Sequence, residues 1–404
     1  MSRQRCAVLF SLIFLGILPA PIARATDQTP ADPTSCEALF THTEAELSEV
    51  RPDFAHNTRY THEVESTEIK NQCGARSCWV FSGTSNIEQK LLTTAGKTID
   101  LSEEYLIAIG MRLKAVEALL TPGNQFRPGG LAANVDWLVQ NFGAVPDAAW
   151  KPRVDFKSPK IAKRMYYFLN ARIAKYHLEA ARTGDAAAKA RLLETAKTDM
   201  LALLESYTGA MPEAFEHDGV KYDSPEDFAE QMIPKDDRIT IRMAPAEADL
   251  PEDIAAIVKK IRPRHVKVKP ESVLLPSNAV SRTRPIEQIG QKIVEALARG
   301  ESVRIGYESV HEFVDEKTGI MSIGAFFIPK GFEPPPRDYR DAYDFKGTGH
   351  AVEIIGVDMG SDGKIIKFKI KNSHGTKVGD AGYYHMYWDY FAAFLSAAYI
   401  RAAK

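Results

Sequence analysis

The sequence predicts an α+β fold in which a helical first half precedes a β-rich second half. Three observations predict it. After Cys78, mostly apolar residues recur in steps of 4, 3 and 4 as far as Leu91, which is the spacing of one helix face. Further helical stripes run through residues 158–233. Strand-like runs separated by glycine-rich turns follow between residues 351 and 388, which is typical of an antiparallel meander.

Length and composition are those of an ordinary globular chain. It has 404 residues, enough for two compact units or one large enzyme core, with 45% hydrophobic and 26% charged residues. The formal net charge is −2, so no overall field favours nucleic acid or an anionic membrane. We therefore expect no nucleic-acid partner.

The first 25 residues have the pattern of a signal peptide. Arg3 and Arg5 precede an apolar run over residues 7–18, and the small residues Ala23 and Ala25 follow. Twelve apolar residues are too few to cross a bilayer. We expect cleavage after Ala25 and a periplasmic or secreted mature chain without a membrane span. An uncleaved anchor is the alternative.

Export bears on the interpretation of the cysteines. When Cys6 is removed with the signal peptide, Cys36, Cys73 and Cys78 remain. An odd number in an oxidising compartment suggests one disulfide and one free thiol. We expect Cys36 to pair with Cys73, with three unpaired cysteines as the alternative. No metal site is expected, because zinc needs about four ligands and no second cysteine pair follows.

Cys78 is the candidate nucleophile. It would lie at or near the first turn of its helix, where the helix dipole and unpaired N–H groups favour a thiolate. Six residues upstream, the amide of Gln72 could join the backbone N–H of Cys78 in an oxyanion hole. The plainer interpretation is a structural cysteine.

A nucleophilic cysteine needs a base, and the base needs a partner that orients it. His350 opens one strand-like run, and Asn372 ends the next one. A meander would bring the two side by side, so that Asn372 fixes the tautomer of the imidazole. A single histidine beside a strand is more often structural, so the hypothesis depends on the whole arrangement.

Three stretches around these residues together resemble the signature blocks of papain-like cysteine peptidases: NQCGARSCW (71–79), GHAVEIIGV (349–357) and KIKNSHGTKVGDAGYY (369–384). The resemblance implies a papain-like two-lobe fold, with a helical lobe and an antiparallel, β-barrel-like lobe. It also implies a thiol protease that hydrolyses peptide or protein substrates without a cofactor. By this likeness the four catalytic residues are the nucleophile Cys78, the base His350, the orienting Asn372 and the oxyanion donor Gln72.

A further stretch, residues 128–146, resembles the glycine pair of that family and the helix after it. Gly129 and Gly130 would line the groove where the substrate backbone passes close to the enzyme. Trp79, directly after Cys78, is another candidate for substrate contact. A Cys-Trp pair by itself is more often core packing, so this assignment depends on the resemblance.

The spacing of the blocks predicts an insertion. Cys78 and His350 are 272 positions apart, whereas the papain signature spans about 130–150, so roughly 120–140 residues are extra. Two segments, 207–233 and 295–313, resemble the bleomycin hydrolase and aminopeptidase C branch, whose hexameric rings make an oligomer an option here. The expected order is a signal peptide (1–25), an N-terminal tether (26–60), the helical lobe with the nucleophile (61–155), a helical insertion (156–235) and the β-rich lobe with His350 and Asn372 (236–404).

Two residues depart from the family pattern. His374 stands where a tryptophan normally shields the Asn–His hydrogen bond, so that bond should be wetter and weaker. Glu353 takes an apolar strand position, and we expect it to face solvent rather than the imidazole. Two alternatives to a working peptidase stay open: a peptidase-fold protein that binds peptides without cutting them, and an exported acyltransferase or amidase that acts on cell-wall peptides.

Overall fold

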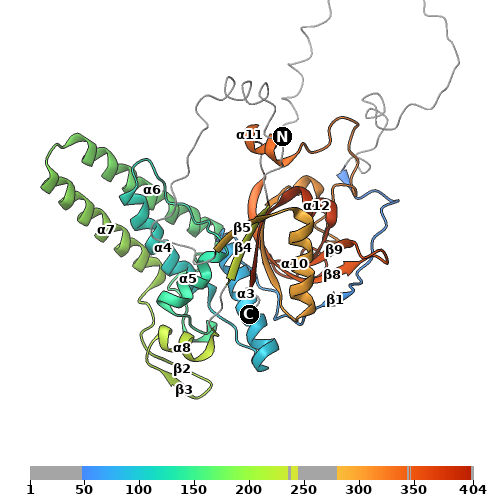
Figure 1. Ribbon diagram of the computed structural model, residues 1–404. Helices are drawn as coiled ribbons and strands as arrows, with labels where there is room; N and C mark the ends of the chain where they lie inside the picture. The colour runs from blue at the N-terminus through green and yellow to red at the C-terminus, as the bar shows by residue number, and fades with distance from the viewer. Residues whose placement is uncertain (1–47, 235–237, 244–279, 344, 346, 402–404) are drawn as a thin grey trace, which may run out of the picture. The chain divides into compact units, whose positions relative to one another are not determined.

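The structure, a computed structural model, describes residues 48–234, 238–243, 280–343, 345 and 347–401 (Figure 1). The predicted signal peptide, Cys36 and the first part of the predicted tether lie outside the described residues. The helices and strands below belong to one unit of the chain, residues 44–327 and 334–404.

The first half consists of helices that share an apolar core. α3 (Cys78–Ala95) confirms the helix predicted after Cys78. α4 (Glu103–Leu120) begins after Ser102, whose hydroxyl accepts the backbone N–H of Tyr105, and α5 (Ala133–Phe142) follows. The shared core includes Val80, Phe81, Leu91, Leu106, Met111 and Leu138.

Two long helices, α6 (Pro159–Arg182) and α7 (Ala186–Thr208), pack side by side (Figure 1). The predicted stripe is confirmed, because Met165, Leu169 and Ile173 of α6 are buried. The helical spacing therefore served inter-helix packing, as such stripes usually do.

A short hairpin and a capped helix follow. Strands β2 (Phe215–His217) and β3 (Val220–Tyr222) pair antiparallel. α8 (Pro225–Met232) begins at Pro225, a residue well suited to the first turn of a helix, and the Ser224 hydroxyl accepts the backbone N–H of Asp227.

The second half is a large mixed sheet, with neighbouring strands in the order β5-β4-β11-β6-β8-β9-β10-β7 and β1 beside β8. The pairs β4/β5 and β7/β10 are parallel and the others are antiparallel. Over the described residues this path is open, so the sheet is less barrel-like and less purely antiparallel than expected. Helices α10 (Ile286–Ala298) and α12 (Trp388–Phe394) pack against it. The strands are β1 (His62–Glu63), β4 (Arg238–Met243), β5 (Val280–Arg284), β6 (Val303–Ser309), β7 (Ile320–Met321), β8 (Thr348–Met359), β9 (Ile365–Lys371), β10 (Tyr383–Tyr387) and β11 (Leu395–Arg401), and the remaining helices are α11 (Arg337–Tyr343) and the 3₁₀ turns η1 (Asp147–Ala149) and η2 (His311–Phe313).

The predicted meander corresponds to β8, β9 and β10. β8 lies between β6 and β9, and its His350 is directly opposite Tyr307 of β6. β9 ends at Lys371, so Asn372 is the first residue beyond that strand. This register brings the end of β9 towards the start of β8, as the sequence predicts.

The expectation that Glu353 faces solvent is wrong. Its side chain is fully buried, and Oε2 accepts the hydroxyl of Ser85 on α3 at 2.5 Å. The Ser302 hydroxyl also donates to this carboxylate. The reason is that α3 packs on β8, so a position that would be open on an uncovered strand faces a helix. Glu353 therefore joins the helical half to the sheet.

Candidate active site

Cys78 is the first residue of α3 and follows the N-cap Ser77. Its side chain is half-buried and packs against the helical core, which also contains Ala351 of β8. The backbone N–H of Ala351 lies within hydrogen-bonding reach of the sulfur. The thiol therefore lies beside the residue that follows His350.

His350 and Asn372 form the hydrogen bond that the sequence predicts. His350 Nε2 is 2.9 Å from Asn372 Oδ1. Because an amide oxygen can only accept, Nε2 carries the proton and Nδ1 presents its lone pair. Asn372 Oδ1 also accepts the backbone N–H of Ser373 at 2.8 Å, which fixes the amide. The imidazole thus has a defined orientation and tautomer.

His374 and Tyr307 flank the His350 ring. The His374 ring stacks on it with 5.1 Å between centroids and an interplanar angle of 26°. Tyr307 meets it edge-on, with centroids 5.7 Å apart. His374 thus covers one face of the imidazole, but it is itself polar and only partly buried.

Gln72 is held next to Asn372 by two hydrogen bonds to Ser373. The Gln72 backbone N–H donates to the Ser373 carbonyl at 2.8 Å, and Gln72 Oε1 accepts the Ser373 hydroxyl at 2.8 Å. Gln72 is buried. With its oxygen occupied, the amide presents its Nε2 as a donor, which is the group that an oxyanion hole needs.

Trp79 supports the glycine pair. Its ring is buried, and its Nε1 donates to the carbonyl of Pro128 at 3.1 Å. A Cβ on Gly130 would lie 2.7 Å from this ring, so only glycine fits there, whereas a Cβ on Gly129 would meet open space. The close approach of backbone to indole explains the glycine at 130. Trp79 acts here as a support beneath the predicted groove.

Burial opposes charge on both candidate reacting groups, the Cys78 thiol and the His350 imidazole. It raises the pKa of the Cys78 thiol, although backbone N–H groups and the charge of Lys114 act in the opposite direction. It lowers the pKa of His350 to about 4, although the bond to Asn372 opposes this. Burial alone thus favours a neutral thiol beside a neutral imidazole, whereas the sequence led us to expect a thiolate at the helix N-terminus.

The other predicted site features are as follows. Cys73 is exposed, and it and Cys78 are free thiols among the residues that the structure describes. Because Cys36 lies outside those residues, its pairing with Cys73 stays a prediction. In the described ranges, no three His, Cys, Asp or Glu side chains come close enough together to hold a metal ion. No helix in those ranges is long and apolar enough to cross a bilayer.

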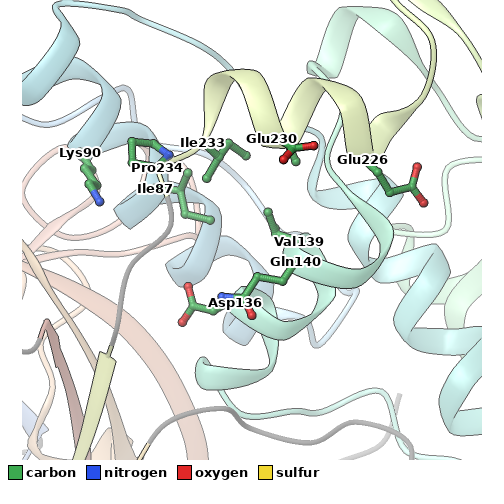
Figure 2. A pocket seen from close by; sticks show the side chains of 10 residues that line it. Ile87, Lys90, Asp136, Val139, Gln140, Glu226, Glu230, Ile233 and Pro234 are labelled. Atoms are coloured by element: carbon green, nitrogen blue, oxygen red, sulfur yellow. The ribbon is translucent and has the colours of Figure 1, made fainter.

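A pocket also lies between α3, α5 and α8 in the helical half (Figure 2). Its lining includes Lys90, Asp136, Glu226 and Glu230. None of the predicted catalytic or substrate-binding residues contributes to it. We therefore keep the Cys78 region as the candidate active site.

Lys114 was missed by the sequence reasoning. It lies on α4, and its ammonium is 4.7 Å from the centroid of the Trp79 ring. A lysine on an amphipathic helix is ordinary, and only the fold shows that it approaches Trp79. No signal in the sequence could have identified it.

The fold, together with a thiol at a helix N-terminus and an imidazole bound to an asparagine, defines the class of papain-like cysteine peptidases. A crystal structure of pepW from Lactobacillus rhamnosis HN001 (DR20) has this fold, with a TM-score of 0.67, 19% identity and coverage of 85% of this chain and 82% of that one.

Comparisons of sequence identify the family. The model of the Peptidase C1-like family matches residues 114–403, and that of the papain family cysteine proteases matches residues 54–111. The chain therefore belongs to the Peptidase C1-like family and is a cysteine-type peptidase.

Two curated relatives are similar over most of their length. Aminopeptidase C of Listeria monocytogenes is 25% identical over 371 residues, which cover 80% of this chain and 78% of the relative. Aminopeptidase C of Streptococcus thermophilus is 24% identical over 390 residues, with 86% and 82% covered. The resemblance to the bleomycin hydrolase and aminopeptidase C branch is thus confirmed.

Proposed function

We propose that the protein is an exported cysteine peptidase that hydrolyses peptide bonds with Cys78, His350, Asn372 and Gln72. The observation that carries the proposal is the 2.9 Å hydrogen bond from His350 to Asn372, together with the contact of Cys78 with Ala351. It supports a base of fixed tautomer on the strand that the thiol touches.

The reaction begins with attack of the Cys78 sulfur on the carbonyl carbon of the substrate. A C–S bond forms while the thiol proton moves to Nδ1 of His350. The carbonyl oxygen becomes an oxyanion, which accepts hydrogen bonds from Gln72 Nε2 and the backbone N–H of Cys78. The tetrahedral species then collapses. The C–N bond breaks, the amine leaves with the proton from His350, and a thioester remains on Cys78.

Hydrolysis of the thioester completes the cycle. His350 accepts a proton from water, whose oxygen attacks the thioester carbon. The C–S bond breaks, the acid product leaves, and the proton returns to the sulfur. Each bond change is balanced by water and by one proton shuttled through His350.

The burial of the Cys78 thiol and the His350 imidazole fits this scheme. Because burial disfavours both thiolate and imidazolium, charge develops only as the sulfur attacks. His350 then acts as a general base during the attack. Asn372 binds Nε2 of the imidazole, so that Nδ1 of His350 is the nitrogen left to accept the proton.

The proposed substrate is a peptide in extended form. Gly130 lies against Trp79, the residue after the proposed nucleophile, and the open space beside Gly129 would let a second backbone approach. The proposed hydrolysis uses only the side chains named above, the backbone N–H of Cys78 and water, and it needs no cofactor.

Covalent labelling tests the proposal. A peptide with a carboxyl-terminal chloromethyl ketone is incubated with the protein, and residual cleavage of a peptide library is followed by mass spectrometry. We expect activity to fall in step with labelling of the tryptic peptide Ser77–Lys90. Full labelling of this peptide with cleavage intact, or activity that follows labelling of the separate peptide Asn71–Arg76, would overturn it.

The proposed location rests on the signal-like residues 1–25 and has its own test. We expect the protein recovered from the periplasm or the medium of a Gram-negative host to begin at Thr26. An N-terminus at Met1 in the cytoplasmic fraction would contradict export and leave the chemistry untouched.

A further inference from the structure

Lys114 brings together three parts of the candidate site. Its Nζ donates to the carbonyl of Pro128 at 3.1 Å and also to the carbonyl of Gly129. The same ammonium lies over the ring of Trp79, 4.7 Å from the centroid. A single cation on α4 thus contacts the glycine segment and the residue after the nucleophile.

These contacts hold the wall of the predicted groove, which we define as residues 128–130. The Pro128 carbonyl accepts two N–H groups, one from Lys114 and one from Trp79 Nε1. The backbone of Gly130 packs so closely on the Trp79 indole that a side chain at position 130 would clash with the ring. Without Lys114 the wall would lose two of these hydrogen bonds, including the one to Gly129.

The charge of Lys114 also acts on the nucleophile. Burial raises the pKa of the Cys78 thiol, and the charge of Lys114 is one of the influences that oppose this rise; a thiolate on Cys78 in turn favours the charged form of Lys114. Glu117 on the same helix also favours the charged ammonium. Burial outweighs both and lowers the pKa of Lys114 to about 8. The positive charge is therefore present below about pH 8 and is lost as the pH rises through that value.

We propose that Lys114 is a positioning residue for peptide hydrolysis: it fixes the wall 128–130 against Trp79 and favours negative charge on the Cys78 sulfur. This inference rests on the function proposed above. Its two effects separate in kinetics, because the wall acts on substrate binding and the charge acts on thiol reactivity.

The experiment compares the parent with Lys114→Met, which keeps the chain length, and Lys114→Arg, which keeps the charge. The rate of alkylation of Cys78 by iodoacetamide is measured against pH on the peptide Ser77–Lys90. Because burial holds the thiol pKa above its ordinary value and Lys114 is neutral above about pH 8, the parent and Lys114→Met should titrate alike, whereas the permanent charge of Lys114→Arg should lower the apparent thiol pKa. The KM for peptide should rise about tenfold in Lys114→Met, because the wall is released.

The pH profile of kcat/KM gives a second readout. The parent should lose activity above about pH 8, where Lys114 loses its proton, and Lys114→Arg should keep its activity to higher pH because arginine stays charged. Identical thiol titrations in all three proteins, or an alkaline limb that stays near pH 8 in Lys114→Arg, would overturn the inference.

The two proposals fail in different ways. If the parent does not cleave peptides, the proposed function fails, while the alkylation profiles still report on the charge of Lys114. If cleavage depends on Cys78 but not on Lys114, only the present inference fails. Should Lys114→Met not fold, as judged by its thermal melt, Lys114→Arg still tests the charge through the alkaline limb.

Discussion

Strand β8 carries two polar side chains whose surroundings differ, the half-buried His350 and the fully buried Glu353. Both oxygens of Glu353 accept hydrogen bonds, one from Ser85 at 2.5 Å and the other from Ser302 and from Asn86 at 3.3 Å. His350 binds Asn372 through Nε2, and in the part of the chain that the structure describes its Nδ1 has no hydrogen-bond partner. A polar group with all its bonds made holds structure together, whereas one with a free lone pair is able to react.

Replacing His350 by alanine tests the reactive member of this pair. We expect kcat to fall by about 10³-fold, because the general base is lost, with little change in thermal stability. Peptide cleavage and a thermal melt measure the two quantities. If the melting temperature of the variant fell so far that unfolding explained the lost rate, His350 would be a structural residue instead.

Glu353→Ala tests the structural member. It leaves the buried Ser85 hydroxyl without its acceptor and removes one acceptor each from Asn86 and Ser302, so we expect the free energy of unfolding to fall by about 2 kcal/mol. Urea unfolding measures this. Glu353→Gln is the matched control, since it keeps the shape and one acceptor and should cost less. An unchanged midpoint in the alanine variant would show that this network does not join the halves.

Asn372 sharpens the comparison, because its hydrogen bond to His350 makes it the proposed orienting residue. Asn372→Ala should lower kcat about 10- to 100-fold by releasing the ring and its tautomer. Asn372→Asp keeps an acceptor and should retain more activity, while its charge raises the pKa of His350. Steady-state kinetics of the two variants decide the matter. Equal losses in both would mean that orientation is not the role of this amide.

The pH dependence follows from burial of the imidazole. Burial lowers the pKa of His350 to about 4, and in the proposed mechanism the ring must be neutral to accept a proton from Cys78. Activity should therefore be kept at pH 5 to 7 and lost as the pH falls through about 4. The acid limb of kcat/KM measures this, with circular dichroism at each pH to confirm that the fold persists. An acid limb near pH 6.5 would mean that burial does not control this group.

The smallest effect is expected at His374, which stacks on His350 at 5.1 Å. His374→Trp should raise kcat a few-fold, because an indole covers more of the Asn–His bond and adds no charge beside it. Phe in place of His374 is the control for size. A fall in rate with both aromatic residues would show that the second imidazole contributes to catalysis.

Much of this site could be predicted from the sequence, since local pattern carried the information. Helical spacing placed Cys78 at the start of α3, and alternation with turns placed Asn372 at the end of β9 beside β8. A Ser-Pro pair is a local signal of the same kind, and Ser224 and Pro225 begin α8.

The remainder depends on contacts between distant segments. Glu353 was placed on the wrong face because the sequence does not show that α3 covers β8. The parallel pairing of β4 with β5 is set by strand order, which local alternation does not encode. Lys114 became visible only once α4 and Trp79 were brought together.

The central claim is that the Cys78 sulfur is the nucleophile, and cleavage by cysteine variants tests it most directly. Peptide products formed by Cys78→Ala and by the matched Cys73→Ala are quantified by mass spectrometry beside the parent. We predict that Cys78→Ala loses at least about 10⁴-fold of the activity while Cys73→Ala keeps it. Cleavage by Cys78→Ala at the parent's rate and at the same bonds would contradict the account.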